Sequence, residues 1–416
     1  MNSRRKFVQK LTVGLAGSVL PAEAFSALTR PAFTSDDFWE NVRSSFPLTK
    51  DRVYFNNGTS GPNSQRVVDK VIAKTNEFSI SGEYGSTNTA REKLAAFVKV
   101  KTEEISLTHN TTEGINIVAW GLPLQKGDEV ILTMHEHVGN ALPWLNRAKL
   151  HGIVLKTFLP AQTAAENIGI IQKLISPKTR VIAIPHITCT TGLVFPVKEI
   201  AAIAKSKGIF TAIDGAHGAG TFDLNLKDLG CDFYATSCHK WMLGPSGTGF
   251  LYVNEKHLDT LQAYWVGAYS DNGWDINTPS PSFQGYVATA HRYDYGSQSA
   301  ALFAGAEESV KFLEEIGMAK IEERIKALAT HLQKGLTGLG SKIQMLTPLE
   351  AKSRISMITF KIEGTDFKEF NTIAAKNKFR IRVVPESNLN AIRISTHIYN
   401  SFEEIDRFVA LVKTLV

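Results

Sequence analysis

The stretch Asp232-Phe-Tyr-Ala-Thr-Ser-Cys-His-Lys-Trp-Met-Leu-Gly-Pro-Ser-Gly-Thr-Gly-Phe-Leu-Tyr-Val253 places one lysine, Lys240, between two apolar runs. The first run, Phe233 to Thr236, is typical of a buried strand, and the second extends from Gly249 to Val253. A Gly/Pro-rich turn separates them. Burial and nearby cations lower the pKa of a lysine, which makes its amine a nucleophile able to form a Schiff base. Lys240 is therefore a candidate catalytic residue.

A second anchor is Gly208-Ile-Phe-Thr-Ala-Ile-Asp-Gly-Ala-His-Gly-Ala-Gly220, in which an apolar run leads into Asp214. This pattern predicts a buried parallel strand with a carboxylate at its carboxyl end, the edge at which open α/β sheets bind ligands. A pyridoxal phosphate enzyme needs a lysine for the aldehyde and an acid that keeps the pyridine nitrogen protonated. Asp214 and Lys240 supply both.

The surrounding pattern predicts an α/β fold with a mostly parallel sheet. A strand over 180–186, a helix over 197–207 and the strand ending at Asp214 form a parallel crossover unit. From about residue 318, amphipathic helices alternate with short strands, which is typical of a smaller α+β domain. We therefore expect a large domain at 51–317 and a small C-terminal domain at 318–416.

The N-terminus resembles an export signal. Ser3-Arg4-Arg5-Lys6-Phe7-Val8 is a twin-arginine pattern, and the apolar segment from Leu11 to Leu20 is too short to span a membrane. We expect a Tat signal peptide at 1–27, a linker and N-terminal segment at 28–50, and a periplasmic or otherwise exported protein. A disordered basic tail is the alternative.

Composition excludes several classes. The formal net charge is +6, and removing residues 1–24 takes away four basic groups and one acid, which leaves +3. No basic run indicates nucleic acid. The three cysteines form neither a disulfide framework nor a metal set, so no metal is expected. The 43% hydrophobic content supports a sizeable core.

The motifs Asp-Gly-Ala-His at 214–217 and Ser-Cys-His-Lys-Trp-Met-Leu-Gly-Pro at 237–245 resemble a known cofactor signature. The chain is similar, over about residues 50 to 416, to the class V aminotransferase family of fold-type I pyridoxal phosphate enzymes, in its isopenicillin N epimerase-like branch. The resemblance implies pyridoxal 5'-phosphate as cofactor, an amino-acid substrate and a homodimer.

Several cofactor contacts follow from the resemblance. Thr111 and Thr112 match the family's phosphate-binding segment, and their expected place at a helix N-terminus favours an anion. An ordinary helix N-cap is the alternative. His137 matches a histidine that stacks on the cofactor ring and can also move protons, which makes it a candidate catalytic residue with Lys240 and Asp214; a satisfied polar residue at a strand end is the alternative. His135 lacks that context and is expected to be structural.

Further contacts surround the lysine. The resemblance places His217 near the phenolic oxygen of the cofactor, and Ser237 and His239 beside Lys240 are expected cofactor contacts. Cys189 stands where related enzymes often carry Asn or Ser. A thiol is a weak hydrogen-bond donor, which puts that contact in doubt.

Three residues have roles that the family alone suggests. Arg393 lies between isoleucines, where it is either an edge charge or the bidentate partner of the substrate carboxylate. Asn57 is either a substrate contact or part of an Asn-Gly turn. Ser297 follows a loop region, Tyr264 to Tyr295, and resembles a residue that caps the phosphate in the partner subunit.

Three function classes remain open. The first is an enzyme that removes the Cα proton of an amino acid, as an aminotransferase or epimerase. The second is a cysteine desulfurase or selenocysteine lyase, which would need a thiol in the segment Pro385-Glu-Ser-Asn-Leu-Asn390, where there is none. The third is a non-catalytic binding protein that kept the fold.

Overall fold

The computed structural model describes residues 35–416, so the expected signal peptide at 1–27 lies outside it. The chain divides into two compact units, residues 1–41 and 42–416. The described part of the first unit belongs to helix α2 (Ser35–Ser44), in a segment expected to be linker. The second unit contains both large sheets and all the candidate site residues.

The main sheet has seven strands, and all but one run parallel. In spatial order they are β2 (Ile105–Thr108), β8 (Gly249–Val253), β7 (Phe233–Ser237), β6 (Phe210–Asp214), β5 (Thr179–Pro185), β3 (Glu129–Thr133) and β4 (Val154–Phe158). Only β8 is antiparallel to its neighbours. The expected mostly parallel α/β sheet is confirmed.

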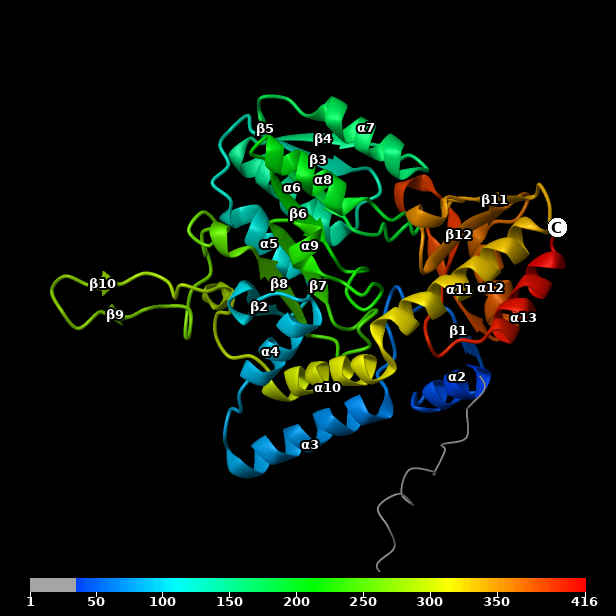
Figure 1. Cartoon of the computed structure of the whole chain (residues 1–416), viewed down its shortest axis with the longest axis horizontal. Helices are drawn as coiled ribbons and strands as arrows, with labels where there is room; N and C mark the ends of the chain where they lie inside the picture. Colours follow the sequence, from blue (N-terminus) through cyan, green and yellow to red (C-terminus); the bar gives the residue numbers. More distant parts are fainter. Residues whose placement is uncertain (1–34) are drawn as a thin grey trace, which may run out of the picture. The chain divides into compact units, whose positions relative to one another are not determined.

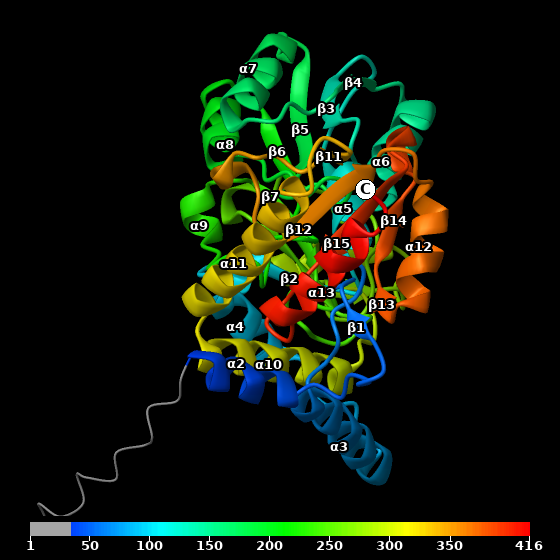
Figure 2. The ribbon, with the colours of Figure 1, turned by 90° about the vertical axis from the view of Figure 1, so that its right-hand side faces the viewer.

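The central strands are buried on both faces because helices cover each side of the sheet. Figures 1 and 2 show α5 (Thr111–Gly121) and α6 (Val138–His151) on one face, and α7 (Ala164–Leu174) and α8 (Val197–Ser206) on the other. Short α9 (Leu226–Leu229) precedes β7. The remaining helices of this region are α3 (Gln65–Ser81), α4 (Asn88–Phe97) and α10 (Ala300–Ile316).

A second, antiparallel sheet lies in the C-terminal part, with its own core. Its order is β11 (Ile343–Met345), β12 (Met357–Ile362), β15 (Ala391–Ser395) and β14 (Arg382–Val384), packed with α11 (Met318–Thr337), α12 (Phe367–Lys376) and α13 (Phe402–Lys413). The early strand β1 (Val53–Tyr54) pairs with β13 (Phe379–Arg380), and Phe55 packs in this core. A segment at the start of the expected large domain therefore packs with the expected small domain. The sequence pattern did not show this because the contact joins residues far apart in the chain.

The region expected to be loop, Tyr264 to Tyr295, contains a short hairpin. Strands β9 (Trp274–Asp275) and β10 (Ser282–Phe283) pair, and Figure 1 shows them reaching away from the main sheet. Strands of two residues are too short to give an alternating pattern, so the sequence did not reveal them. Within the described residues, no helix combines the length and apolar character needed to cross a bilayer.

Phe408 tests the second core. Its ring is fully buried and contacts four others, those of Phe55, Phe360, Phe370 and Phe379. We expect Phe408→Ala to lower the free energy of unfolding by about 3–5 kcal/mol in urea titrations. Leu349, which is 66% exposed, is the control, and its alanine variant should change stability by less than about 0.5 kcal/mol. Equal losses would contradict the assignment of this core.

Candidate active site

A cavity of about 320 Å³ opens at the carboxyl ends of β6 and β7. It combines basic, acidic and hydroxyl side chains drawn from both parts of the 42–416 unit. The lining residues are Gly58, Thr59, Asn110, Thr111, Thr112, His137, Gly139, Cys189, Asp214, Ala216, His217, Ser237, His239, Lys240, Arg382 and Arg393. Nine of the eleven residues predicted for the site line it, and Asn57 and Ser297 do not.

Lys240 follows β7 in a tightly held turn. The Gly61 N–H donates to the His239 carbonyl at 2.7 Å, and the Asn57 Nδ2 donates to the Lys240 carbonyl at 3.4 Å. A Cβ on Gly61 would stand 2.1 Å from that Lys240 oxygen, so the close approach requires glycine. Burial lowers the pKa of Lys240 below that of an ordinary lysine, against the opposing effect of the Asp214 carboxylate.

Asp214 ends β6 and is 4% exposed. One of its oxygens accepts a hydrogen bond from the Ala216 N–H at 2.9 Å. A buried carboxylate is costly unless positive groups lie near it, and Lys240 and Arg393 line the same cavity as Asp214. The Asp214 carboxylate also suits a protonated, cationic group of a bound ligand.

The N-terminus of α5 forms one wall of the cavity. The Thr111 N–H donates to the Ser237 hydroxyl at 2.8 Å, and the two hydroxyl oxygens lie 2.7 Å apart. Thr112 is exposed at the same helix end. The His239 Nδ1 is buried and has no partner among the described residues. Helix-end N–H groups, hydroxyls and an unpaired imidazole nitrogen form a donor set that fits a phosphate.

His137 caps the N-terminus of α6. Its Nδ1 accepts a hydrogen bond from the Gly139 N–H at 3.0 Å, which fixes the ring at the mouth of the cavity. A Cβ on Gly139 would lie 2.4 Å from the Thr112 hydroxyl, so α5 and α6 meet closely here. His135 is buried and does not line the cavity, and burial lowers its pKa.

Two arginines reach the cavity from the C-terminal sheet. Arg393 is 1% exposed and donates to the Cys189 carbonyl at 2.5 Å and to the Thr59 hydroxyl at 3.1 Å. Arg382, which the sequence analysis missed, is the register partner of Arg393 on β14 and forms an ion pair with Glu386. The missed signal is the alternation in Phe379-Arg-Ile-Arg-Val383, which places two arginines on one side of an extended segment.

Asn57 and Ser297 lie elsewhere. Asn57 is fully buried beneath the Lys240 turn, where its Oδ1 accepts a hydrogen bond from the Tyr399 hydroxyl at 2.9 Å. Ser297 is exposed and lines a separate pocket with Tyr269 and Asp294. The expected contact of Ser297 with the phosphate in the partner subunit stays a prediction.

Cys189 lines the cavity, and its environment keeps it protonated. Its side chain is 5% exposed. Burial raises the pKa of the thiol to about 11, despite the nearby Arg393 and Lys240 charges. A thiol in this state is a poor nucleophile at neutral pH, because the thiolate is the reactive form.

Comparison with known proteins agrees with this geometry. The family model described as "Aminotransferase class-V" matches residues 73–408. The chain belongs to the class V aminotransferase family. It is 30% identical to an isopenicillin N epimerase from Streptomyces clavuligerus, over 89% of this chain and 96% of that protein. It is also 33% identical to a probable cysteine desulfurase from Halalkalibacterium halodurans, over 76% of this chain and 79% of that protein.

Solved structures show the same fold. A cysteine desulfurase from Thermococcus onnurineus NA1, solved without ligand, aligns with a TM-score of 0.81 at 26% identity and covers 91% of this chain and 98% of its own. A C-DES variant with glycine covalently linked to its pyridoxal phosphate aligns with a TM-score of 0.83 at 24% identity, over 90% of this chain and 99% of its own. The architecture is fold-type I, and pyridoxal phosphate is the cofactor of the family.

The pH dependence of stability tests the environment of Lys240. Because its pKa is lowered on folding, the unfolded chain binds more protons, and stability should rise with pH until the ordinary lysine pKa of about 10.4 is passed. In cofactor-free protein, Lys240→Met should therefore gain stability over wild type at pH 7, and the difference should shrink towards pH 10.5. Urea titrations measure it.

The control is Lys198→Met, at a lysine whose side chain is 59% exposed, and its effect should stay small and independent of pH. A difference between Lys240→Met and wild type that is constant or grows with pH would refute the buried-amine assignment.

Proposed function

We propose that this protein is a pyridoxal phosphate enzyme that removes the Cα proton of an α-amino acid or a derivative, as an aminotransferase or an epimerase. The observation that carries the proposal is the convergence of Lys240, Asp214 and Arg393 on one cavity. A lone buried lysine has many explanations. An amine with a lowered pKa, a buried carboxylate and a buried guanidinium together match the three groups that such a reaction requires.

When bound, pyridoxal phosphate supplies an aldehyde for amines and a ring that accepts the electron pair of a broken Cα bond. Lys240 supplies the amine, and its Nζ takes the α-proton and returns it. With the cofactor bound, the Asp214 carboxylate would keep a proton at the ring nitrogen. Thr111, Thr112, Ser237 and His239 would hold the phosphate, and His137 would pack on the ring.

Arg393 positions the substrate. Its buried guanidinium keeps its planar fork in place through Cys189 and Thr59, and its Nε has no partner among the described residues. A carboxylate bound there is fixed in orientation as well as in place, which brings the Cα–H bond towards the Lys240 amine. This arrangement supports a role for Arg393 in binding the α-carboxylate.

A cysteine desulfurase is the second candidate, since several relatives carry that name. The segment between β14 and β15 contains no cysteine, and the Cys189 thiol in the cavity is held protonated. Both observations favour transamination or epimerisation over sulfur transfer. A non-catalytic binding protein would have no need for the complete set of amine, carboxylate and phosphate-binding groups.

Arg393→Lys tests the substrate class. The lysine keeps the charge but loses the fork, so affinity for amino acids should fall about tenfold or more while cofactor content stays the same. Spectral titration with L- and D-amino acids, and with their decarboxylated amines, measures this. Equal affinity for the acids and the amines in wild type would remove Arg393 from this role.

The reaction class has its own measurement in wild type. Exchange of the Cα hydrogen with deuterated water should accompany turnover of the true substrate, and cysteine should release little sulfide. Efficient sulfide release from cysteine would instead make the desulfurase assignment the better one.

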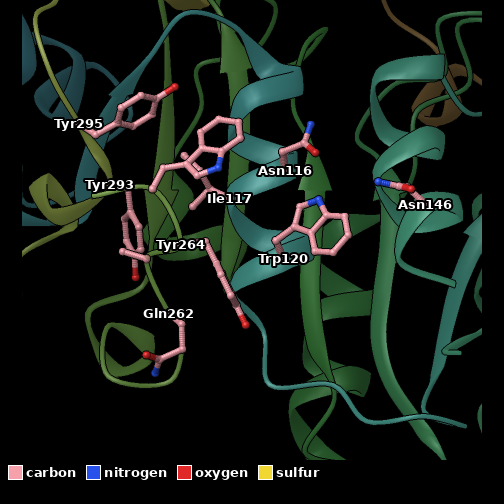
Figure 3. A pocket seen from close by; sticks show the side chains of 10 residues that line it. Asn116, Ile117, Trp120, Asn146, Gln262, Tyr264, Tyr293 and Tyr295 are labelled. Carbon is pink, nitrogen blue, oxygen red and sulfur yellow. The ribbon is translucent and has the colours of Figure 1, made fainter. Parts of the chain in front are cut away.

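We also propose a homodimer. An aromatic pocket of about 420 Å³ is lined mainly by residues of α5 and of the region that follows β8, and Figure 3 shows Trp120, Tyr264, Tyr293 and Tyr295 around it. In the same region of the sequence, the β9–β10 hairpin exposes Trp274, Ile276 and Phe283, and Trp265 is 56% exposed. Large exposed apolar groups on one chain support association with another copy, which would also bring the partner subunit's phosphate to Ser297.

Sedimentation velocity at micromolar concentration tests the dimer. Wild type should sediment as a dimer, and Trp265→Glu with Trp274→Glu should shift it towards monomer, because charges replace apolar contacts. Leu349→Glu, at an exposed leucine outside this region, is the control and should leave the dimer intact. A monomeric wild type would defeat the proposal.

We propose that the folded protein is exported by the Tat pathway. Twin-lysine replacement of Arg4 and Arg5 should leave cofactor-loaded protein in the cytoplasm, because that pathway reads the arginine pair. Fractionation followed by absorption spectra measures this. Undiminished periplasmic protein from the twin-lysine variant would indicate another route.

A further inference from the structure

Trp241 follows Lys240 directly and contacts the active site through another residue. Its indole is fully buried, and its Nε1–H donates to the His217 Nδ1 at 3.0 Å. An indole nitrogen can only donate a hydrogen bond, so the His217 Nδ1 must accept and carries no proton. In the neutral ring the single proton then lies on Nε2.

The opposite edge of the His217 ring, which carries Nε2, is turned to the cavity. Its Nε2 lies 3.3 Å from the Lys240 Nζ, and the ring is 3% exposed. We propose that Trp241 is a positioning residue that fixes His217 as the Nε2–H tautomer, with that N–H directed at the position where the cofactor meets Lys240. The tautomer of His217 does not depend on the proposed function. The effect of this tautomer on a bound cofactor does rest on the proposed function.

The charges around His217 also favour the neutral ring. Burial lowers the pKa of His217 well below its usual value, and the nearby positive charge of Lys240 adds to this. The titratable and charged groups that face it come from several elements: Asp214, Lys240, His137, Arg382 and Arg393. Protonating Nδ1 would, in addition, break the bond from Trp241.

Trp241 is itself held in a fixed orientation. The His397 ring stacks on the indole, with centroids 5.5 Å apart and planes 25° apart. The His397 Nε2–H donates to the Trp241 carbonyl at 3.0 Å, while its Nδ1 accepts from the Ile398 N–H at 2.7 Å. A Cβ on Gly220 would lie 2.4 Å from the same carbonyl, so the chain is packed on that side too. His397, from the C-terminal part of the chain, thereby helps to fix the orientation of the His217 ring through Trp241.

This arrangement limits what His217 can do. A neutral ring with its Nδ1 occupied offers one donor to the cavity and no acceptor there. It can hold a hydrogen-bond acceptor in place, but it cannot take a proton from a substrate without losing the Trp241 bond. His217 therefore remains a fixed donor, and proton transfer falls to other groups of the cavity such as the Lys240 amine.

Nitrogen NMR of the full-length chain with ¹⁵N-labelled histidine tests the tautomer, with cofactor bound and after its removal. In wild type, His217 should show an unprotonated Nδ1 and a protonated Nε2 at neutral pH. Trp241→Phe keeps the stacking on His397 but removes the N–H, so His217 should become a mixture of tautomers. Trp144→Phe removes another buried indole donor, to Asn140, and should leave the His217 signals unchanged.

A pH titration of the visible absorption of the bound cofactor gives the second measurement. Trp241→Phe should move the midpoint of this titration upwards by about 0.5–1 pH unit. The reason is that the His217 Nε2–H, which favours the deprotonated form of the bound cofactor, is no longer fixed as a donor. In a His217→Gln background, where no tautomer exists, the same change should move it little. A protonated Nδ1 in wild type, or an equal shift in both backgrounds, would overturn the role of Trp241.

Discussion

The turn that carries Lys240 is the constraint on which the site depends. The strand β7 delivers a lysine into a buried region, and the surrounding chain must hold its main chain still while leaving its amine free. The Gly61 N–H and the Asn57 side chain bond to the carbonyls of the turn, and Tyr399 bonds to Asn57. The turn is thus fixed from the N-terminal segment and from the C-terminal part of the chain together. Because the main chain of the turn is fixed, the Lys240 amine can stay in a buried position, where desolvation lowers its pKa.

The same arrangement explains why the two parts of the 42–416 unit share one cavity. The main sheet presents Asp214 and the Lys240 turn at its carboxyl edge, and the C-terminal sheet presents Arg393 and Arg382. The proposed function therefore places substrate binding and proton transfer on different parts of the chain. A small displacement between them would separate the guanidinium from the amine, which gives the buried contacts between Arg393, Cys189 and Thr59 a functional meaning.

The sequence was sufficient for features set by local pattern. Apolar runs ending in Asp214 and Ser237 predict buried parallel strands, and parallel strands bring their carboxyl ends to one edge. Local patterns do not predict which distant residues come into contact. Arg382 enters the site because β14 pairs with β15, Asn57 is turned beneath the lysine by Tyr399, and Trp241 bonds to a histidine 24 positions earlier. The alternation around Arg382 indicates an extended segment but not the strand it pairs with, and the contacts of Asn57 and Trp241 leave no periodic signal in the sequence.

The central claim, that Lys240 is the residue that binds the cofactor, has a direct measurement. Borohydride reduction of the purified protein, followed by proteolysis and peptide mass spectrometry, locates the lysine that carries the pyridoxyl group. The account predicts a single modified peptide containing Lys240, which disappears in Lys240→Ala. Modification of a different lysine in wild type, or the same yield from Lys240→Ala, would contradict it.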